Sequence, residues 1–482
     1  MSLQMTSDPS KPTLYQQVAG RIRSLIDGGT LRPGDRVPSV RRLSSQMSIS
    51  ISTVLEAYRV LEDERYIEAR PQSGYYVRTP ATIPPVPTKT RSDRVPLEPG
   101  ADDLVVRVIS DSQKPGIVPL GAAIPSAEYF PTVRLNRILA RVVRDDPGTS
   151  QSYDSIAGHQ GLRVQIARRL VEAGLSVTPD DIITSAGAQE AVLLCLRAVT
   201  KPGDTVAVET PTYFGLLEAI RSLHLRVLEI GTDADEGVCL EDLSEAIVRK
   251  RVAACVFVPN FGNPLGHKMP DDRKAELVSL LARHDVPLIE DDIYADLAFE
   301  GDRPVAAKSF DRADNVLLCS SFSKTLAPGY RVGWVVPGKY RPLVERLKFS
   351  TSVATATPTQ MAVASYLESG GFDRHLRRLR RLYRDQVARV ACTVGETFPE
   401  GTRVSRPLGG HILWVEMPQE IDSLEVYGRA LEEGISVAPG PLFSAADKYR
   451  NFLRLNCALP WSDETEDAIA RLGRLVSAIA LR

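Results

Sequence analysis

The chain has 482 residues, with 59 Lys and Arg against 60 Asp and Glu, so its net charge is −1. This length predicts two or three domains, and the even charge balance excludes a general polyanion binder. The six cysteines are scattered, without CxxC pairs or metal-ligand spacing, so we expect reduced thiols and no metal site. Residues 1–11 are polar, unlike a signal peptide, and no apolar run reaches membrane-spanning length, so we expect a cytoplasmic protein.

Residues 1–79 have the pattern of a small domain of three helices and a β-hairpin. Apolar residues at helical spacing predict a helix over Thr13–Gly28, a second starting near Ser39, and a third from Ser50 to about Glu64. The segment YIEARPQSGYYV alternates around a glycine-containing turn, which predicts a two-stranded wing. The inward-facing residues expected on the second and third helices are Val40, Leu43, Met47, Val54, Leu55, Tyr58 and Leu61.

Three helices followed by a wing are typical of a module that binds double-stranded DNA, with the third helix in the major groove. Basic residues outnumber acidic ones by 11 to 8 over residues 1–79, which suits a few phosphate contacts. For Arg41 and Arg42 the alternative is that they only solvate a helix face. The predicted DNA-contacting residues are Arg41, Arg42, Ser50, Ser52 and Thr53 on the helices and Arg70, Gln72 and Ser73 on the wing.

Residues 80–113 have the composition of a stiff linker. Six prolines fall within Pro80–Pro99, and large apolar residues are sparse. In the polyproline conformation, about 30 residues would span on the order of 90 Å. Such a linker would let the N-terminal domain fold back onto a partner subunit.

Residues 114–482 predict a larger α/β domain. Near-continuous apolar strands alternate with helices, which favours a mostly parallel sheet covered on both faces. Helices are expected at Ala188–Val199 and Gly215–Leu223, and the last third of the chain predicts a smaller α/β domain. The expected strands of the larger sheet lie in DIITSAG, DTVAVET, AACVFVPN, VPLIEDDIY and NVLLCSSFSK.

One loop of this domain, SFSKTLAPGYRVGW, has the residue types of a pyridoxal phosphate site. That cofactor forms a Schiff base with a partly deprotonated lysine amine, which makes Lys324 the candidate catalytic residue. Ser321, Ser323 and Arg331 can all reach a phosphate, Arg331 as a bidentate donor. A Ser-x-Ser-Lys sequence alone is ordinary surface sequence, so the prediction depends on the full string.

Other segments supply further parts of such a site. Gly187, Ala188 and Gln189 lie between a strand and a helix, where backbone amides and the helix dipole bind phosphate. Tyr213 is placed to stack on the pyridine ring, or is a core aromatic. Asn263 can donate to the ring's phenolic oxygen, or is a turn asparagine before proline.

Two acidic residues compete for the pyridine nitrogen. Asp291 stands at the end of a predicted strand and would keep the nitrogen protonated, so that the ring acts as an electron sink. Tyr294, three residues on, can share the phenolic oxygen, and Asp292 lacks this spacing. Arg454 is expected in mid-strand, where an arginine is costly unless paired. A substrate or effector carboxylate is its natural partner, and an internal salt bridge is the alternative.

Residues 12–79 resemble the winged helix-turn-helix of the GntR family through LRPGDRVPSVRRL and STVLEAYRVLEDERYIEARPQSGYYV. Members usually carry arginine directly after the serine that opens the recognition helix, where this chain has Ile51. An isoleucine offers a thymine methyl only apolar contact, so we expect an operator different from that of arginine-bearing relatives.

Leu120–Arg482 resembles the fold-type I aminotransferases through ITSAGAQEAV, VETPTYFG, PNFGNPLG, IEDDIY, SFSKTLAPGYRVGW and FLRLN, in that order. The fusion of both parts looks like the MocR subgroup of GntR regulators. The resemblance implies a cofactor site at a homodimer interface, so that Tyr153 would reach the phosphate bound by the neighbouring subunit. His159 and His267 stand alone in the sequence, and we treat them as structural or surface residues. The resemblance also implies Lys324 as the covalent attachment point, Asp291 for the ring nitrogen, Asn263 with Tyr294 for the phenolic oxygen, Ser321, Arg331 and the Gly187–Gln189 amides for the phosphate, and Arg454 for an α-carboxylate.

Three hypotheses follow for function. The first is a pyridoxal phosphate-dependent transcription regulator that senses the cofactor or an amino compound. The second is an active aminotransferase with an incidental head, because the residues for half of a transamination are all present. The third is a constitutive DNA-binding dimer whose large domain only dimerises. We favour the first, because a recognition helix and a wing have no use in a metabolic transaminase.

Overall fold

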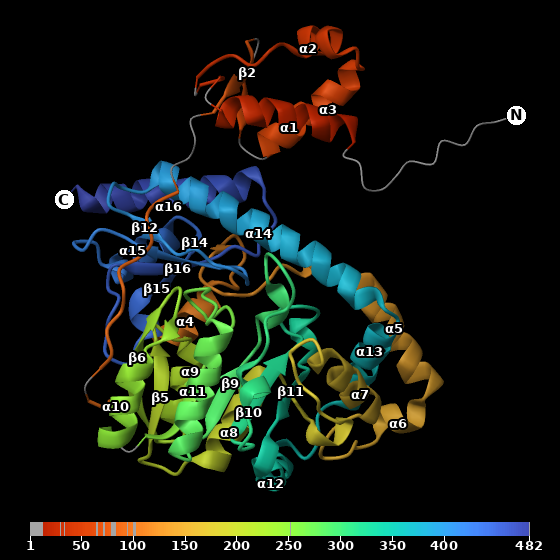
Figure 1. Cartoon of the computed structure of the whole chain (residues 1–482), viewed down its shortest axis with the longest axis vertical. Helices are drawn as coiled ribbons and strands as arrows, with labels where there is room; N and C mark the ends of the chain where they lie inside the picture. Colours follow the sequence, from red (N-terminus) through yellow and green to blue (C-terminus); the bar gives the residue numbers. More distant parts are fainter. Residues whose placement is uncertain are drawn as a thin grey trace, which may run out of the picture. The chain divides into compact units, whose positions relative to one another are not determined.

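The computed structural model describes residues 13–28, 30–32, 34–63, 66–70, 73–78, 83–93, 95–99, 103–250 and 252–481. The chain divides into two compact units, Met1–Thr82 and Ile83–Arg482 (Figure 1). Among the described residues, no helix has the length and apolar character needed to cross a bilayer.

The first unit is a three-helix domain with a hairpin, as predicted. Its elements are α1 (Leu14–Asp27), α2 (Val40–Met47), α3 (Ile51–Asp63), β1 (Ile67–Arg70) and β2 (Gly74–Val77). Ser39 caps α2 by accepting a hydrogen bond from the Arg42 backbone, and Ser48, with a φ of 52°, ends it. The predicted inner stripe was wrong at Leu55, which is 40 % exposed, whereas Ala57 is buried.

The hydrophobic core of this unit fixes the hairpin against α3. Tyr58 is fully buried, its hydroxyl donates to the Pro38 carbonyl at 2.5 Å, and its ring meets Tyr75 edge-on at 4.9 Å. β1 and β2 pair antiparallel from Ile67 opposite Val77 to Arg70 opposite Gly74. One aromatic side chain therefore joins the third helix to the wing and to the turn before α2.

The second unit contains an eight-stranded sheet in the order β4-β11-β10-β9-β8-β5-β6-β7. The pairs from β10 through β9, β8 and β5 to β6 are parallel, and β4, β11 and β7 join antiparallel. The mostly parallel sheet is thus confirmed. Its strands are β4 (Ile183–Ser185), β5 (Thr205–Thr210), β6 (Arg226–Asp233), β7 (Gly237–Val238), β8 (Val252–Phe257), β9 (Leu288–Asp291), β10 (Val316–Ser321) and β11 (Gly333–Val336).

Alternate residues of these strands enter two cores on opposite faces of the sheet, because successive side chains of a strand point in opposite directions. Val206 and Val208 pack with α8 (Ala188–Val199), α9 (Phe214–Ser222) and α12 (Arg341–Ser352). Ala207 packs with α10 (Leu240–Lys250) and α11 (Asp271–Arg283) on the other face. A third core joins α5 (Thr132–Asp145), α7 (Gln160–Leu170) and α13 (Thr357–Glu368) to the β10–β11 end, with α6 (Pro147–Gln151) beside them.

The predicted smaller domain is built on an antiparallel sheet in the order β12-β13-β16-β15. Trp414 on β13 is almost completely buried and stacks on Phe452 at 5.2 Å. The long helix α14, visible in Figure 1, packs on α16. The elements are β12 (Arg403–Val404), β13 (Ile412–Glu416), β15 (Ala438–Pro439), β16 (Phe452–Asn456), α14 (Gly371–Thr397), α15 (Ser423–Glu432) and α16 (Asp463–Ala480), with the pair β3 (Val118–Pro119) and β14 (Ile435–Ser436) alongside.

The segment expected as a stiff linker, residues 80–113, packs against the second unit in its described part. Residues 83–93 and 95–99, here called the strap, lie along the second unit. The strap begins on the small sheet, where Pro85 accepts from the Val404 amide at 2.8 Å, and it ends on β6, where Leu97 and Val227 exchange backbone hydrogen bonds. Residues 104–111 form α4, whose Val108 enters the small domain's core. The proline content indicates an extended chain, but it does not indicate the surface against which that chain packs.

Replacing Leu61 by alanine should destabilise the first unit. Leu61 is fully buried, so we expect the free energy of unfolding to fall by about 2–5 kcal/mol. Hydrogen exchange of the α1–α3 amides in the full-length protein measures this change. Ile51→Ala is the matched control, because Ile51 is 50 % exposed and its truncation should change stability by about 0.5 kcal/mol or less. Equal effects of the two substitutions would contradict this packing.

Candidate functional site

A cavity of about 230 Å³ lies where the parallel strands of the large sheet end. Ligand sites of open α/β sheets lie at the carboxyl ends of the strands, because loops from neighbouring strands meet there. The cavity brings together most of the predicted cofactor residues. Its lining includes Ala188, Gln189, Tyr213, Asn263, Asp291, Tyr294, Ser321, Ser323, Lys324, Arg331 and Arg454.

Two predicted residues are absent from this lining. Gly187 is the residue before α8 and has a φ of 93°, and a Cβ there would collide with the Arg331 guanidinium, so the backbone requires glycine. Tyr153 is 87 % exposed in the single chain. Its expected contact with a neighbouring subunit therefore stays a prediction.

One end of the cavity is rich in hydrogen-bond donors. Arg331 donates to the Ala186 carbonyl at 2.8 Å and to the Ser323 hydroxyl at 3.3 Å, so its guanidinium is held beside the start of α8. The Ser321 hydroxyl accepts from the Ser323 amide at 3.3 Å. A guanidinium, two hydroxyls and a helix N-terminus together match the requirements of a phosphate group.

Lys324 is half-buried beside positive charge. Its ammonium donates to the Ala123 carbonyl at 2.6 Å. Burial, followed by the charges of Arg454 and Arg331, lowers its pKa to about 8, and Asp291 opposes them. A substantial neutral fraction of this amine near neutral pH makes it a nucleophile.

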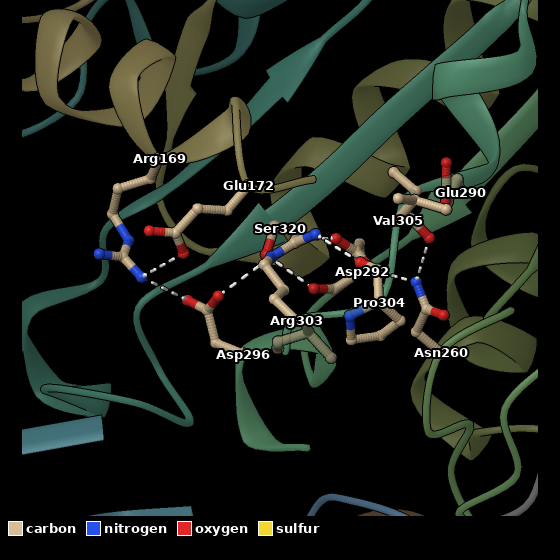
Figure 2. A network of polar contacts seen from close by, with 12 residues as sticks. Arg169, Glu172, Asn260, Glu290, Asp292, Asp296, Arg303, Pro304, Val305 and Ser320 are labelled. Atoms are coloured by element: carbon tan, nitrogen blue, oxygen red, sulfur yellow. Dashed lines mark hydrogen bonds and ion pairs between the residues drawn. The ribbon is translucent and has the colours of Figure 1, made fainter. Parts of the chain in front are cut away.

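The two acidic neighbours at the end of β9 have different surroundings. Asp291 lines the cavity, and burial, followed by the charge of Asp292, raises its pKa to about 7. Asp292 is outside that lining and pairs with Arg303 and Asn260, as Figure 2 shows. Only Asp291 is therefore available to a molecule in the cavity.

Arg454 has unused hydrogen-bonding capacity. It is fully buried in the middle of β16 and donates from Nη2 to the Gly121 carbonyl, while its Nε and Nη1 have no partner. Among the described residues no carboxylate pairs with it, so the salt-bridge alternative finds no support. The rings of Phe214 and Phe443 lie 5.6 and 5.3 Å from its guanidinium carbon. Burial lowers its pKa to about 10.

Several lining residues escaped the sequence analysis. Ile109 comes from α4, and Ala122, Ala123 and Ile124 come from the segment after β3. Small and apolar residues carry no motif, and Ile109 fell within the expected linker. His411 lies near the site: burial, followed by the charge of Lys324, lowers its pKa to about 3, and its Nδ1 lies 3.2 Å from the Asn456 side-chain oxygen.

The two histidines set aside as structural or surface residues fit that reading. His159 lies 3.4 Å from Asp154 and outside the cavity. His267 is buried 3.5 Å from Glu209. Neither lines the cavity.

The predicted DNA-contacting residues form two groups on the first unit. Ser50 hydrogen-bonds Ser52 and Thr53 at the start of α3, at 2.8 and 2.7 Å, and Arg41 and Arg42 are exposed on α2. On the wing, Arg70 pairs with Glu68 at 2.8 Å and covers the Tyr76 ring, and Ser73 contacts the Tyr76 hydroxyl at 2.6 Å. Whether Arg70 contacts DNA stays a prediction. Gln72 lies outside the described residues.

Comparisons with known proteins agree with this division of the chain. Residues 14–77 match the family described as bacterial regulatory proteins, gntR family, and residues 118–472 match aminotransferase class I and II. The HTH-type transcriptional regulators YjiR and YdcR of Escherichia coli, both named uncharacterized, are 42 % and 40 % identical. YjiR aligns over 96 % of this chain and 99 % of its own, and YdcR over 96 % and 98 %.

The chain belongs to the GntR-type regulators of MocR architecture. The solved structure of LysN, an α-aminoadipate aminotransferase from Thermus thermophilus complexed with N-(5'-phosphopyridoxyl)-L-leucine, matches the large unit with a TM-score of 0.72. It is 27 % identical and covers 78 % of this chain and 97 % of its own. The fold-type I architecture is thereby confirmed, and the family implies pyridoxal phosphate as the cofactor.

The reactivity of Lys324 should depend on pH with a midpoint near 8. Its lowered pKa means that the neutral amine accumulates as the pH rises through about 8. Arg454→Met removes a charge that lowers this pKa, so the midpoint should move upward. Amine-reactive labelling followed by peptide mapping measures it. Lys348 is the internal control, because burial lowers its pKa to about 8 without a contribution from Arg454. A midpoint near 10.5 for Lys324 in the unchanged protein would contradict this account.

Proposed function

We propose that the cavity binds pyridoxal phosphate and that its loading, or its reaction with an amino compound, controls DNA binding. When bound, the cofactor supplies an aldehyde that reacts with amines and a ring that withdraws electrons. The unpartnered nitrogens of Arg454 support the proposal most directly, because a buried guanidinium with free donors fits an incoming carboxylate. The effector is accordingly an amino acid or a related amine.

Each part of the cofactor has a complementary set of residues. Lys324 would provide the attaching amine, and the Asp291 carboxylate would accept a hydrogen bond from the protonated ring nitrogen and keep it protonated. Tyr213 would stack on the ring, while Asn263 and Tyr294 would contact its phenolic oxygen. Ser321, Ser323, Arg331 and the Gly187–Gln189 amides would hold the phosphate, and in a homodimer Tyr153 of the second subunit would add to them.

The strap offers a route from this cavity to the DNA-binding unit. Lys448 lies 2.7 Å from Asp93 of the strap and 3.0 Å from Glu229 on β6. Glu229 is completely buried and also accepts from the Ser444 hydroxyl at 3.0 Å and the Ala445 amide at 2.6 Å. Phe443, directly before these residues, covers the Arg454 guanidinium.

A second contact joins the strap to the other side of the cavity. The Thr90 hydroxyl donates to the Thr210 carbonyl at 2.8 Å. Thr210 ends β5, and the chain continues directly into Tyr213, which lines the cavity. A ligand that reorders the loops at Tyr213 and Phe443 would therefore shift the strap, whose other end continues into the DNA-binding unit.

DNA recognition is assigned to α3 and the wing. Ser50, Ser52 and Thr53 stand at the N-terminus of α3, the end that enters the major groove in helix-turn-helix proteins. Arg41 and Arg42 would contact phosphates or a guanine edge. We infer a homodimer on a two-part operator.

Aminotransferase activity is the second candidate, because the cavity collects the same residue types as the aminotransferases of the same fold. Steady turnover of a common amino acid at ordinary enzyme rates would favour it over regulation. A regulator instead binds promoter DNA with an affinity that responds to the cofactor or an amino acid.

Lys324→Ala should remove the visible absorbance that pyridoxal phosphate gives with the protein, because no amine would remain in the cavity. DNA from the promoter beside the gene should then bind with an affinity that no longer responds to the cofactor. Absorbance spectra and fluorescence anisotropy with labelled DNA measure the two effects. Lys348→Met is the control, a second buried lysine outside the cavity. An unchanged spectrum in Lys324→Ala would refute the assignment.

Lys448→Met should weaken the coupling of the strap to the cavity while leaving the cofactor in place. It removes the link between Asp93 and Glu229 but not the Thr90 contact, so pyridoxal phosphate should still bind while hydrogen exchange at the strap amides responds to it less. Lys89→Met is the matched control, because Lys89 pairs with Asp233 from the same strap but is 84 % exposed, where such pairs contribute little. Equal responses in both variants would exclude this route.

A further inference from the structure

A buried polar network outside the cavity lining is centred on Asp292, as Figure 2 shows. The Asp292 carboxylate accepts from the Asn260 amide at 3.0 Å and pairs with Arg303. Arg303 also donates from Nε to Asp296 at 3.0 Å, and Asp296 lies 3.7 Å from Arg169. The side chain of Asp292 is fully buried, and that of Arg303 is only 7 % exposed.

This network joins the ends of three neighbouring strands. Asn260 belongs to the segment after β8 that leads to Asn263, and Asp292 directly follows β9 and Asp291. Ser320 on β10, next to Ser321, donates to the Asp292 backbone carbonyl at 3.0 Å. Each of the three residues is therefore covalently close to a side chain that lines the cavity.

The charges of the network also act on the cavity. Around Asp291 the acidic and basic groups are Asp292, Lys324 and Glu209, the last of these on β5, and Tyr213, Tyr294 and Cys319 also face it. The negative charge of Asp292 raises the pKa of Asp291, whereas Lys324 lowers it. Arg303 lies directly against Asp292 and offsets its charge. Burial strengthens these effects because water screens them weakly.

We infer that Asp292 and Arg303 are positioning residues. They hold Asp291, Asn263 and Ser321 in place relative to one another, and they set the pH at which the groups around the cofactor are protonated. Neither touches the cavity, so both act through their neighbours. The inference rests on the proposed cofactor. Purely structural ion pairs would stabilise the fold without affecting proton equilibria in the cavity, and this difference can be measured.

Opposite charge changes at the two positions provide the test. Arg303→Gln removes a positive charge near the cavity, so protonation there becomes easier. Asp292→Asn removes a negative charge, so protonation becomes harder. The pH midpoint of the visible absorbance of the full-length protein loaded with pyridoxal phosphate should rise in the first variant and fall in the second, each by about half a pH unit or more. The double variant restores the charge balance and should return the midpoint toward that of the unchanged protein.

Arg163→Gln is the matched control. Arg163 is a buried arginine on α7, paired with Asp180 at 3.0 Å, and lines neither the cavity nor the network. This substitution should leave the midpoint unchanged. Circular dichroism confirms that each variant is folded.

Shifts of the same sign in both single variants, or none in either, would overturn the positioning role. A double variant that departs further from the unchanged protein than either single one would also overturn it. Absence of visible absorbance in the unchanged protein is a separate result and would overturn the proposed cofactor instead. The two failures are thus distinguishable.

Discussion

Positive charge buried without a full complement of partners is the constraint on which the large unit depends. Arg454 is fully buried, Lys324 is half-buried in the cavity wall, and Asp291 is the one carboxylate among the described residues of the cavity lining. Burying an ionised group is costly unless charge or hydrogen bonds compensate it. The chain meets this cost in part, with the carbonyls of Ala123 and Gly121 accepting from the two cations. The remaining donors make an anionic ligand the natural occupant.

The surrounding fold serves to hold those charges in place. Parallel strands bring Asp291, Ser321 and the segment bearing Asn263 to one edge, and the buried acid beside Asp291 is balanced by an arginine rather than by solvent. Arrangements of this kind are sensitive to small displacements, because the interaction energy between two charges changes steeply with their distance where the dielectric constant is low. A domain of this construction is well suited to respond to ligand binding as well as to catalyse.

The sequence predicted the site residues that belong to motifs at strand ends. It did not predict how the strap packs against the second unit. Lys324 and Arg331 were predicted from one continuous motif and Arg454 from its place in an apolar strand, and all three line one cavity. The path of the strap was not predicted, since its prolines specify an extended backbone but no binding surface. Leu55 was assigned to the core by periodicity alone, and Ile109 escaped notice because an isoleucine carries no chemical signature.

The strap also protects the large sheet. Asp93 and Leu97 occupy backbone hydrogen-bonding positions along β6, through the Asp93 amide to the Glu229 carbonyl and the mutual bonds between Leu97 and Val227. A fragment that starts near Leu120, where the resemblance to aminotransferases begins, would lack the strap. The backbone groups of β6 that the strap pairs with would then be free to pair with another chain. Anyone who isolates the large domain for crystallisation should therefore begin the fragment no later than Ile83, or expect it to self-associate.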